Sequence, residues 1–378
     1  MKKKLSIKVP AFLLAVVLSL SLLSGCGNSA AQSSSAASVP AASSLAASSS
    51  ASASDTQQIT DMIGNQVTIP AAVSKVFCTS PIGTYIMYTL APDKLLGWNT
   101  ELSDGAKKYI SAEYQDLPVL GGTMGGQNTF NTEAITALAP DIILDFSYNN
   151  QVSDMVTQLG QQTGIPVVTL DSSLTGTPDA YRLLGQILGV EDRGNELADY
   201  AKKALDNISS MVSKVPDSEK VKIYYVESAD GLKTDGTDSM HTEVINFVNA
   251  TNVVDMDTSA SGKGTAVSME QVLNWNPDVI LANSGMGGSD FISTVYSDST
   301  WSGISAVQNH RIYVPASLPF NWFDRPPCMA RIIGSEWLAA KLYPDYVKVD
   351  LTNDVKSFYK TFFNVDITDA QANTLIGD

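Results

Sequence analysis

The sequence predicts an α/β protein of two Rossmann-like α/β lobes, joined by a single long helix, with a ligand cleft between the lobes. Short apolar and β-branched runs alternate with segments of helical periodicity, an order typical of parallel sheets. A long helical tract separates two halves with similar patterns. The folded part is too long for one small domain, so two lobes are expected.

A pattern repeated in the two halves supports this architecture. In the first half, Glu133 is followed by Pro140, an Asp and an apolar strand; in the second, Glu270 is followed by Pro277, an Asp and an apolar strand. In both halves the Glu precedes the Pro by seven positions. Equal spacing at corresponding places indicates two lobes that are wound in the same way.

The predicted elements follow in a regular order. Strands are expected over residues 75–78, 141–146, 166–170, 221–226, 279–281 and 312–314. Helices are expected over residues 82–90, 132–138, 152–160, 178–215 with a break near 189–194, and 329–342. We therefore predict an N-terminal lobe over 57–174, an interlobe helical backbone over 175–216 and a C-terminal lobe over 217–378.

The first 56 residues are predicted to be an export signal and a tether. Residues 1–25 join lysines to an apolar stretch that is too short to span a bilayer. The ending Leu-Ser-Gly-Cys resembles the lipobox of bacterial lipoproteins, which implies cleavage before Cys26 and acylation of its thiol. Residues 26–56 are then the lipidated Cys and an Ala/Ser-rich flexible linker. We expect a protein anchored through Cys26 at the extracytoplasmic face of the cell membrane.

Charge excludes one class of partner. The formal net charge is −15, and removal of the signal peptide takes away four lysines and no acids. A nucleic-acid partner requires a basic face, so none is expected. An anionic ligand is still compatible, because a local pocket can oppose the net field.

The Cys and His content argues against a resident metal site. Apart from Cys26, only Cys78 and Cys328 occur, and we expect two buried free thiols, with a disulfide bridge as the alternative. There are two histidines and no Cys/His cluster, so neither a built-in metal nor another cofactor is expected.

Several ordered features give the chain a resemblance to a known family. They are Val67–Pro70 before the strand at 75–77 and Ser80-Pro81, then Leu95–Gly97, the two Glu-to-Pro-Asp segments, Leu188–Glu191 in the helical tract, and Val307–Val314 before a late loop. In this order, behind a lipobox, they are similar to substrate-binding lipoproteins of the iron-complex family, which serve ABC importers for siderophores, haem, cobalamin and related metal compounds. The resemblance covers residues 59–345.

The resemblance implies a function and partners. The protein would act as a monomer that captures a metal complex and delivers it to the permease dimer of an ABC importer with a cytoplasmic ATPase. A metal chelate of modest charge is the expected ligand, and a metal oxyanion such as molybdate or tungstate is the alternative. Glu133 and Glu270 match the family's two docking acids, which meet arginines of the permease; their other role would be to favour the helix macrodipole.

Candidate ligand residues lie in loops after the predicted parallel strands, where such sheets bind ligands. On the N-terminal lobe they are Ser80, Tyr85, Gly122, Met124 and Tyr148. Gly122 and Met124 belong to a glycine-rich loop over 121–126, whose backbone N–H groups would approach a ligand closely. Tyr148 would offer a flat ring and a hydroxyl, or would pack at the rim.

The C-terminal lobe supplies a segment dense in aromatic residues and Pro. Arg325 would fork onto a carboxylate or a metal oxyanion, and Trp322 and Phe320 would stack on a chelate. The alternative is that Asp324 and Arg325 form an ion pair at the surface, while the aromatic side chains fill the interior of the C-terminal lobe. Ser284 lies in a weaker glycine-rich loop, and His241 would ligate an open metal position or donate to an anion, or would be a surface residue at the start of a helix. The C-terminal candidates are therefore His241, Ser284, Phe320, Asn321, Trp322 and Arg325.

An enzyme is not expected. The sequence contains no Gly-x-Ser-x-Gly, no His-Glu-x-x-His and no Cys–His motif. Neither histidine lies in a recognisable catalytic arrangement. A binding function is therefore favoured over a cell-surface hydrolase, and the paired Glu residues favour an importer partner over a sensor role.

Overall fold

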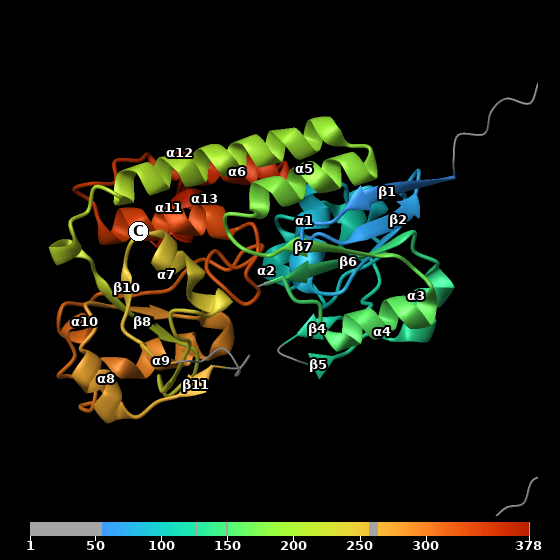
Figure 1. Cartoon of the computed structure of the whole chain (residues 1–378). Coiled ribbons are helices and arrows are strands. Elements are labelled where there is room, and N and C mark those ends of the chain that lie inside the picture. The colour runs from blue at the N-terminus through green and yellow to red at the C-terminus, as the bar shows by residue number, and fades with distance from the viewer. Residues whose placement is uncertain (1–54, 125–126, 149, 257–263, 378) are drawn as a thin grey trace, which may run out of the picture. The chain divides into compact units, whose positions relative to one another are not determined.

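The computed structural model describes residues 55–124, 127–148, 150–256 and 264–377 (Figure 1). The predicted signal peptide, Cys26 and nearly all of the linker lie outside these residues. Within the described ranges, no helix has both the length and the apolar character that a membrane crossing requires.

The N-terminal lobe contains a parallel sheet with the strand order β3-β6-β7. Phe77 pairs with Ile143, and Leu144 pairs with Val168, so the apolar runs lie in register. Its strands are β3 (Val76–Cys78), β6 (Ile142–Ser147) and β7 (Val167–Asp171), and two hairpins add β1 (Thr56–Thr60), β2 (Gln66–Pro70), β4 (Thr123–Met124) and β5 (Gln127–Asn128). Its helices are α1 (Pro81–Leu90), α2 (Asp104–Lys107), α3 (Thr132–Leu138) and α4 (Asp154–Thr163).

The C-terminal lobe contains a second parallel sheet with the order β10-β8-β12-β13. Its strands are β8 (Lys222–Val226), β10 (Thr251–Asn252), β12 (Val279–Ala282) and β13 (Ile312–Tyr313), and β9 (Lys233–Thr234) pairs with β11 (Thr265–Ala266) apart from this sheet. Its helices are α7 (Glu243–Phe247), α8 (Met269–Trp275), α9 (Gly288–Val295) and α10 (Ser305–Gln308). The two parallel sheets confirm the predicted α/β class with two similarly built lobes.

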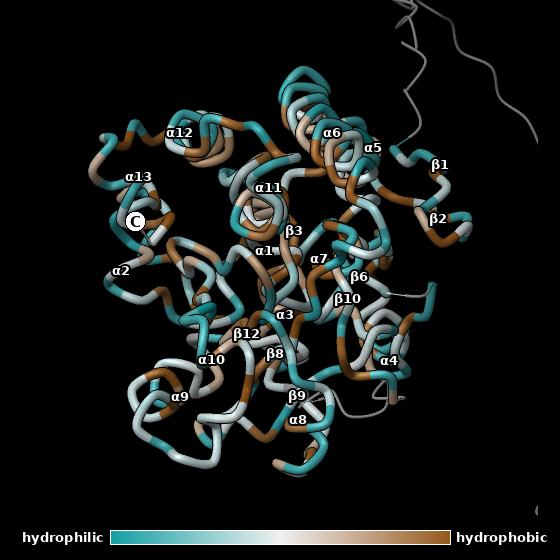
Figure 2. The backbone as a smooth tube through the Cα atoms, turned by 90° about the vertical axis from the view of Figure 1, so that its left-hand side faces the viewer, coloured by the Kyte–Doolittle hydropathy of each residue, from teal (hydrophilic) through white to brown (hydrophobic). Residues whose placement is uncertain are grey.

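The helical tract between the sheets is a hairpin. Helix α5 (Thr177–Leu188) ends at Gly189, whose φ of +67° is left-handed, and α6 (Glu191–Val212) runs back beside it (Figure 1). The helices approach closely where Gly185 faces Gly194, because a Cβ on Gly185 would meet the Gly194 Cα at 3.1 Å. The brown and teal residues that alternate along α6 in Figure 2 reflect its one buried face. The single long helix between the lobes is therefore α6, and the break in the tract is the turn.

The repeated Glu-to-Pro-Asp pattern produces the same local structure twice. Helix α3 ends at Ala139 and α8 ends at Asn276, both in the left-handed conformation. The Asp that follows then accepts a hydrogen bond from the start of the neighbouring strand: Asp141 Oδ2 from the Lys75 N–H at 2.9 Å, and Asp278 Oδ2 from the Lys222 N–H at 2.9 Å. The Asp thus fixes each strand to its neighbour, which explains why both halves carry it.

The C-terminal segment adds helices that the sequence analysis did not resolve. Arg193 of α6 donates to the carbonyl oxygens of Thr89 and Thr361, at 3.1 and 2.6 Å, and the rings of Tyr88 and Phe363 stack 6.5 Å apart. The last segment therefore also packs on α1 of the N-terminal lobe. Its helices are α11 (Arg331–Leu342), α12 (Leu351–Phe363) and α13 (Asp369–Ile376).

The thiol prediction is confirmed. Cys78 and Cys328 are both buried and free. Burial raises the pKa of the Cys328 thiol to about 11 and raises that of Cys78 as well, so both stay protonated and inert at neutral pH.

We predict that Glu336→Gln stabilises the protein in a pH-dependent way. Burial is the main cause that raises the pKa of Glu336 from 4.5 to about 8, and a hydrogen bond with the Asp354 carboxyl of α12 adds to it. Between these values the folded chain holds a proton that the unfolded chain releases, so the wild type loses stability as pH rises. The gain in free energy of unfolding from Glu336→Gln should therefore grow by roughly 1–3 kcal/mol across this window.

Urea denaturation over a pH series measures this gain, and the exposed Glu191→Gln on α6 is the matched control. A gain that does not change with pH would contradict a shared proton between Glu336 and Asp354.

Candidate functional site

The candidate site groups follow the carboxyl ends of the strands in both lobes. Ser80 lies just past β3, Tyr148 past β6 and Ser172 past β7; Glu227 follows β8 and Asn283 follows β12. This is the edge at which parallel α/β sheets bind their ligands. The local pattern of a buried strand followed by polar residues therefore positions most of the site.

Unpartnered hydroxyl groups mark the N-terminal lobe's contribution. The Oγ atoms of Ser80 and Ser172 are enclosed and have no hydrogen-bond partner among the described residues. Ser80 is the N-cap of α1, yet its side chain makes no capping bond. A buried hydroxyl without a partner costs free energy, which a ligand or a water would relieve. Ser172 is not among the residues predicted from the sequence, although it follows a buried strand just as the predicted Tyr148 does.

Tyr148 lies where groups from both lobes meet. It is half-buried. Burial raises the pKa of its phenol, and the negative charge of Glu243, from the C-terminal lobe, raises it further. The phenol is therefore protonated at neutral pH and available as a hydrogen-bond donor.

The Arg331–Glu243 ion pair of the C-terminal lobe also makes hydrogen bonds to the backbone of the N-terminal lobe. Arg331 Nη1 donates to Glu243 Oε2 at 2.6 Å, and Nη2 donates to the carbonyl oxygen of Ser172 at 2.6 Å. Glu243 Oε1 accepts from the backbone N–H of Leu174 at 2.9 Å. Ser172 and Arg331 also line a cavity of about 10 Å³, together with Cys328 and others. That volume has room for about one water molecule.

Arg325 is held inside the C-terminal lobe. Its Nε donates to Glu227 in a short contact, its Nη2 donates to Asp235 Oδ2 at 2.9 Å, and Asp324 Oδ2 lies 3.6 Å from Nε. The side chain is 13% exposed, and the Glu227 and Asp235 side chains are at most 1% exposed. The prediction that Arg325 donates two hydrogen bonds to an anionic ligand is therefore corrected, because its Nε and Nη2 already donate to Glu227 and Asp235, which also balance its charge.

The charge balance of this group follows from burial. Burial raises the pKa of Glu227 to about 8, although the Arg325 guanidinium opposes the shift. Glu227 Oε2 has no partner among the described residues. One guanidinium thus faces three carboxyl groups, and the group offers little positive charge to a ligand.

Of the predicted ligand residues, His241 has the position and the hydrogen bonding best suited to contact a ligand. It lies in the 3₁₀ turn Met240–Thr242, and its Nδ1 is 2.7 Å from Oδ1 of Asp324, which is fully buried. The ring is 15% exposed, and no described residue partners Nε2. Burial lowers the pKa of the imidazole, but the Asp324 carboxylate outweighs it, so the pKa lies above its ordinary 6.5.

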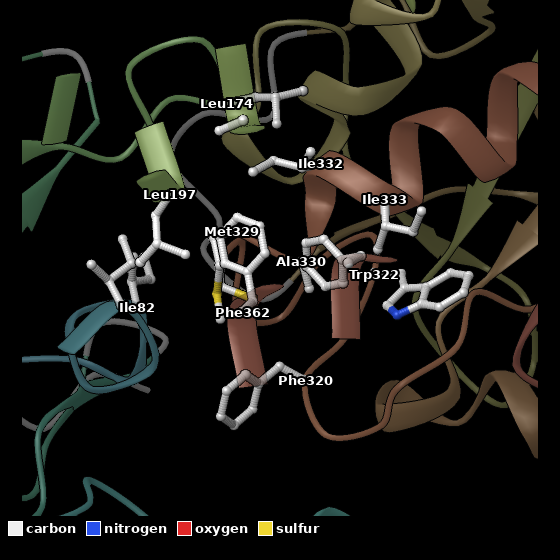
Figure 3. Close-up of a cluster of buried hydrophobic side chains, with 14 of the residues drawn as sticks. Ile82, Leu174, Leu197, Phe320, Trp322, Met329, Ala330, Ile332, Ile333 and Phe362 are labelled. Carbon is white, nitrogen blue, oxygen red and sulfur yellow. The ribbon is translucent and has the colours of Figure 1, made fainter. Parts of the chain in front are cut away.

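The aromatic residues predicted to stack on a ligand are core residues instead. Trp322 is 1% exposed and Phe320 is 3% exposed, and both lie in the cluster of buried apolar side chains in Figure 3. Phe320 stacks on Tyr85 with ring centroids 3.6 Å apart. Asn321 accepts from the backbone N–H groups of Phe323 and Asp324, which fixes the turn. The predicted ligand roles of Trp322, Phe320, Tyr85 and Asn321 are corrected, because the faces or atoms they would use are occupied.

Gly122 also has a structural role. Its N–H donates to Thr129 Oγ1 at 3.0 Å, and a Cβ at this position would lie 2.7 Å from the Thr79 carbonyl oxygen. Glycine is required there for close packing, and its N–H is not available to a ligand, which corrects that prediction. Met124 lies in β4 and Ser284 begins the 3₁₀ turn Ser284–Met286, but their side chains lie outside the described residues.

The two predicted docking acids occupy equivalent positions. Glu133 lies in the first turn of α3 and Glu270 in the first turn of α8, and both are exposed. Asn131 and Ser268 cap these helices, so the two carboxylates also favour the helix dipoles.

The donor set is suited to a ligand that already carries its metal. Among the described residues, no three His, Cys, Asp or Glu side chains gather where they could hold a metal ion. The site instead offers one imidazole edge and the phenol of Tyr148, with the enclosed, unpartnered hydroxyls of Ser80 and Ser172 behind them. Such groups can complete the coordination of a chelated metal or donate hydrogen bonds to an anion.

We predict that Arg325→Ala lowers the free energy of unfolding by about 3 kcal/mol, because it leaves the buried carboxyl groups of Glu227 and Asp235 without the cation and the hydrogen bonds that they share. The matched control is Arg182→Ala, which removes an exposed arginine paired with Asp179 and Asp199 and should cost less than about 1 kcal/mol. Equal effects in urea denaturation would contradict a bracing role for Arg325.

Comparison with known proteins gives concordant results. The model of the periplasmic binding protein family matches residues 91–317. The chain is 26% identical over 336 residues to the molybdate-binding protein MolA of Haemophilus influenzae, with 81% of this chain and 90% of that protein covered. It is 24% identical over 256 residues to a vitamin B12-binding protein of Vibrio parahaemolyticus, with 67% and 84% covered.

A solved structure agrees with these matches. An ABC transporter solute-binding protein from Sulfurospirillum deleyianum superimposes with a TM-score of 0.78 at 29% identity, covering 85% of this chain and 99% of that one. All three are solute-binding proteins, and the last belongs to an ABC transporter. The chain belongs to the periplasmic binding protein family, whose members work with ABC importers and bind metal-related ligands.

Proposed function

We propose that the protein captures a metal complex with one exchangeable coordination position and delivers it to an ABC importer. The observation that carries this proposal is the pairing of His241 with the buried Asp324, with Nδ1 and Oδ1 2.7 Å apart. Histidines that ligate metals typically donate a hydrogen bond from their other ring N–H to a carboxylate, which orients the ring and raises its basicity. His241 Nε2 would then be the ligand.

The chemistry of the surrounding groups narrows the ligand class. One imidazole cannot hold a bare metal ion, so most of the coordination must come from the solute, as in siderophores, haem and cobalamin. The cations closest to the site, Arg325 and Arg331, are each held by carboxylates. A strongly anionic chelate would find no compensating charge there, which favours a complex of modest charge. The likeness to a vitamin B12-binding protein is compatible with this class.

A metal oxyanion is the second candidate. It is favoured by the likeness to a molybdate-binding protein and by three hydroxyl donors, those of Ser80, Ser172 and Tyr148. In this case a protonated His241 would donate from Nε2 to an oxyanion oxygen. The two candidates therefore require opposite protonation states of the same ring.

The protein is proposed to act at the extracytoplasmic face of the membrane. The Leu-Ser-Gly-Cys sequence before the Ala/Ser-rich linker supports lipidation of Cys26. Mass spectrometry of the membrane fraction tests it: the wild-type N-terminus should carry acyl chains, and a Cys26→Ser variant should appear without them.

Titration with a panel of ferric siderophores, haemin, cobalamin, molybdate and tungstate tests the ligand class. We predict that His241→Ala weakens binding of the accepted solute at least about tenfold, because it removes a metal ligand. His310→Ala is the matched control, because His310 is exposed, lies before β13 rather than past its carboxyl end, and has its ring centroid 5.1 Å from that of the exposed Tyr296. Equal affinities for the wild type and His241→Ala would contradict the proposal.

The pH dependence of affinity separates the two candidates. The Asp324 carboxylate keeps the pKa of His241 above 6.5. A metal complex must compete with a proton for Nε2, so its affinity should fall as pH drops through that pKa, by up to about tenfold per pH unit. An oxyanion bound by the charged ring should show the opposite slope. Isothermal titration of the accepted solute between pH 5.5 and about 8.5 measures the sign.

We also propose that Glu133 and Glu270 dock the permease. The double variant Glu133→Ala with Glu270→Ala should leave ligand affinity unchanged and reduce uptake by about tenfold, because exposed carboxylates steer and orient association. The double variant of the exposed Glu101 and Glu191 is the matched control. Normal uptake by the Glu133/Glu270 variant in cells that depend on this importer would remove the docking proposal.

A further inference from the structure

We propose that the neutral His241 ring carries its proton on Nδ1, facing the Asp324 carboxylate, and that a buried hydrogen-bond chain from the Gly285 N–H through Asn283 and Tyr225 holds this carboxylate in place. The hydrogen-bond chain connects β12, β8 and the segment after β13 to the turn that carries His241. It makes Tyr225 and Asn283 positioning residues for the carboxylate that orients the imidazole. The tautomer is a property of the free protein, but its functional meaning rests on the proposed ligand role of Nε2.

The direction of the chain is set at Asn283. The Gly285 N–H donates to Asn283 Oδ1 at 2.9 Å. Because a backbone N–H only donates, the atom that faces it must be the amide oxygen. The Asn283 amide nitrogen therefore faces Tyr225 and donates to its hydroxyl oxygen at 2.5 Å. Asn283 is 2% exposed, so water has little access to exchange these partners.

The hydrogen bond from Asn283 also determines where the hydroxyl proton of Tyr225 points. Its oxygen accepts from Asn283, and its single proton must go elsewhere. The remaining partner is Asp324 Oδ2 at 3.1 Å. Tyr225 and Asp324 are both fully buried, which excludes water as a competing acceptor. Asp324 thus receives a hydrogen bond on Oδ2, and Nε of the Arg325 guanidinium lies 3.6 Å from the same oxygen.

The last step determines the tautomer. An ionised carboxylate only accepts hydrogen bonds, so the atom facing Asp324 Oδ1 must carry a proton. That atom is His241 Nδ1, at 2.7 Å. The single proton of a neutral ring is then on Nδ1, and Nε2 keeps its lone pair. A metal requires this lone pair, whereas the other tautomer would present an N–H and repel the metal.

Nitrogen-15 NMR of the purified protein with labelled histidine tests the inference. The protein contains two histidines, so a His310→Gln variant assigns the signals. Above the pKa of the ring, located by titration, we expect a protonated, pyrrole-like Nδ1 and an unprotonated, pyridine-like Nε2 for His241. The reverse pattern, or an equal mixture, in the wild type would overturn the proposal without any variant.

The Asp324→Asn variant then tests whether the hydrogen-bond chain has a fixed order of donors and acceptors. With Tyr225 donating to the amide oxygen, the new amide nitrogen must donate to His241 Nδ1, which shifts the ring proton to Nε2. Adding Tyr225→Phe removes that direction, so the amide can rotate and the shift should diminish. Tyr225→Phe alone should keep the wild-type tautomer, because the carboxylate still accepts from Nδ1. An unchanged tautomer in a folded Asp324→Asn variant would contradict the chain.

These results are separate from the proposed function. If the wild type has the expected tautomer but His241→Ala binds the accepted solute normally, the ligand role of His241 fails and the positioning chain stands. If the tautomer is wrong while His241→Ala loses binding, the chain fails and the ligand role stands.

Discussion

The buried carboxylate of Asp324 is the group on which the C-terminal lobe's part of the site depends. A fully buried charge is tolerated only when hydrogen bonds and an opposite charge compensate it. Tyr225 and His241 supply the hydrogen bonds and Arg325 supplies the charge. Arg325 is in turn shared with Glu227 and Asp235, so its donors are used inside the lobe. This constraint leaves the imidazole edge of His241 as the group that a solute can reach.

A second constraint sets how the two lobes meet at the site. The Arg331–Glu243 pair of the C-terminal lobe holds the backbone of Ser172 and Leu174 just past β7. A partly buried ion pair of this kind is costly to break when one partner is lost. It fixes the exit of β7, and with it the unpartnered Ser172 hydroxyl. The positions of the Ser172 hydroxyl and of the His241 edge therefore both depend on buried charged groups.

Local sequence patterns were sufficient to predict the fold, but they could not predict which side chains pair with one another in the site. Apolar runs, strand-exit residues and the spacing from Glu133 to Pro140 are short-range signals, and each produced the expected element. The partners of Arg325 were not predictable, because Glu227 and Asp235 lie 98 and 90 positions earlier in the chain. Asp324 was recognised only as a neighbour of Arg325, whereas its partner His241 lies 83 positions away.

The aromatic segment shows the same limit. Trp322 and Phe320 have the composition of a stacking surface, but composition does not reveal what covers a side chain. Phe320 is covered by Tyr85, from the other lobe, and Trp322 lies close to α11, where a Cβ on Gly334 would meet the Trp322 carbonyl oxygen at 1.7 Å. Glycine at 334 could have suggested a close approach, but not the identity of the residue that approaches.

X-ray absorption at the metal edge of the protein loaded with the solute accepted from the panel is the most direct test of the central claim. We expect scattering from one imidazole, with a nitrogen at about 2.1 Å from the metal, in the wild type and not in His241→Ala. A loaded wild-type protein whose metal shows only the ligands of the free solute would contradict the claim that His241 completes its coordination.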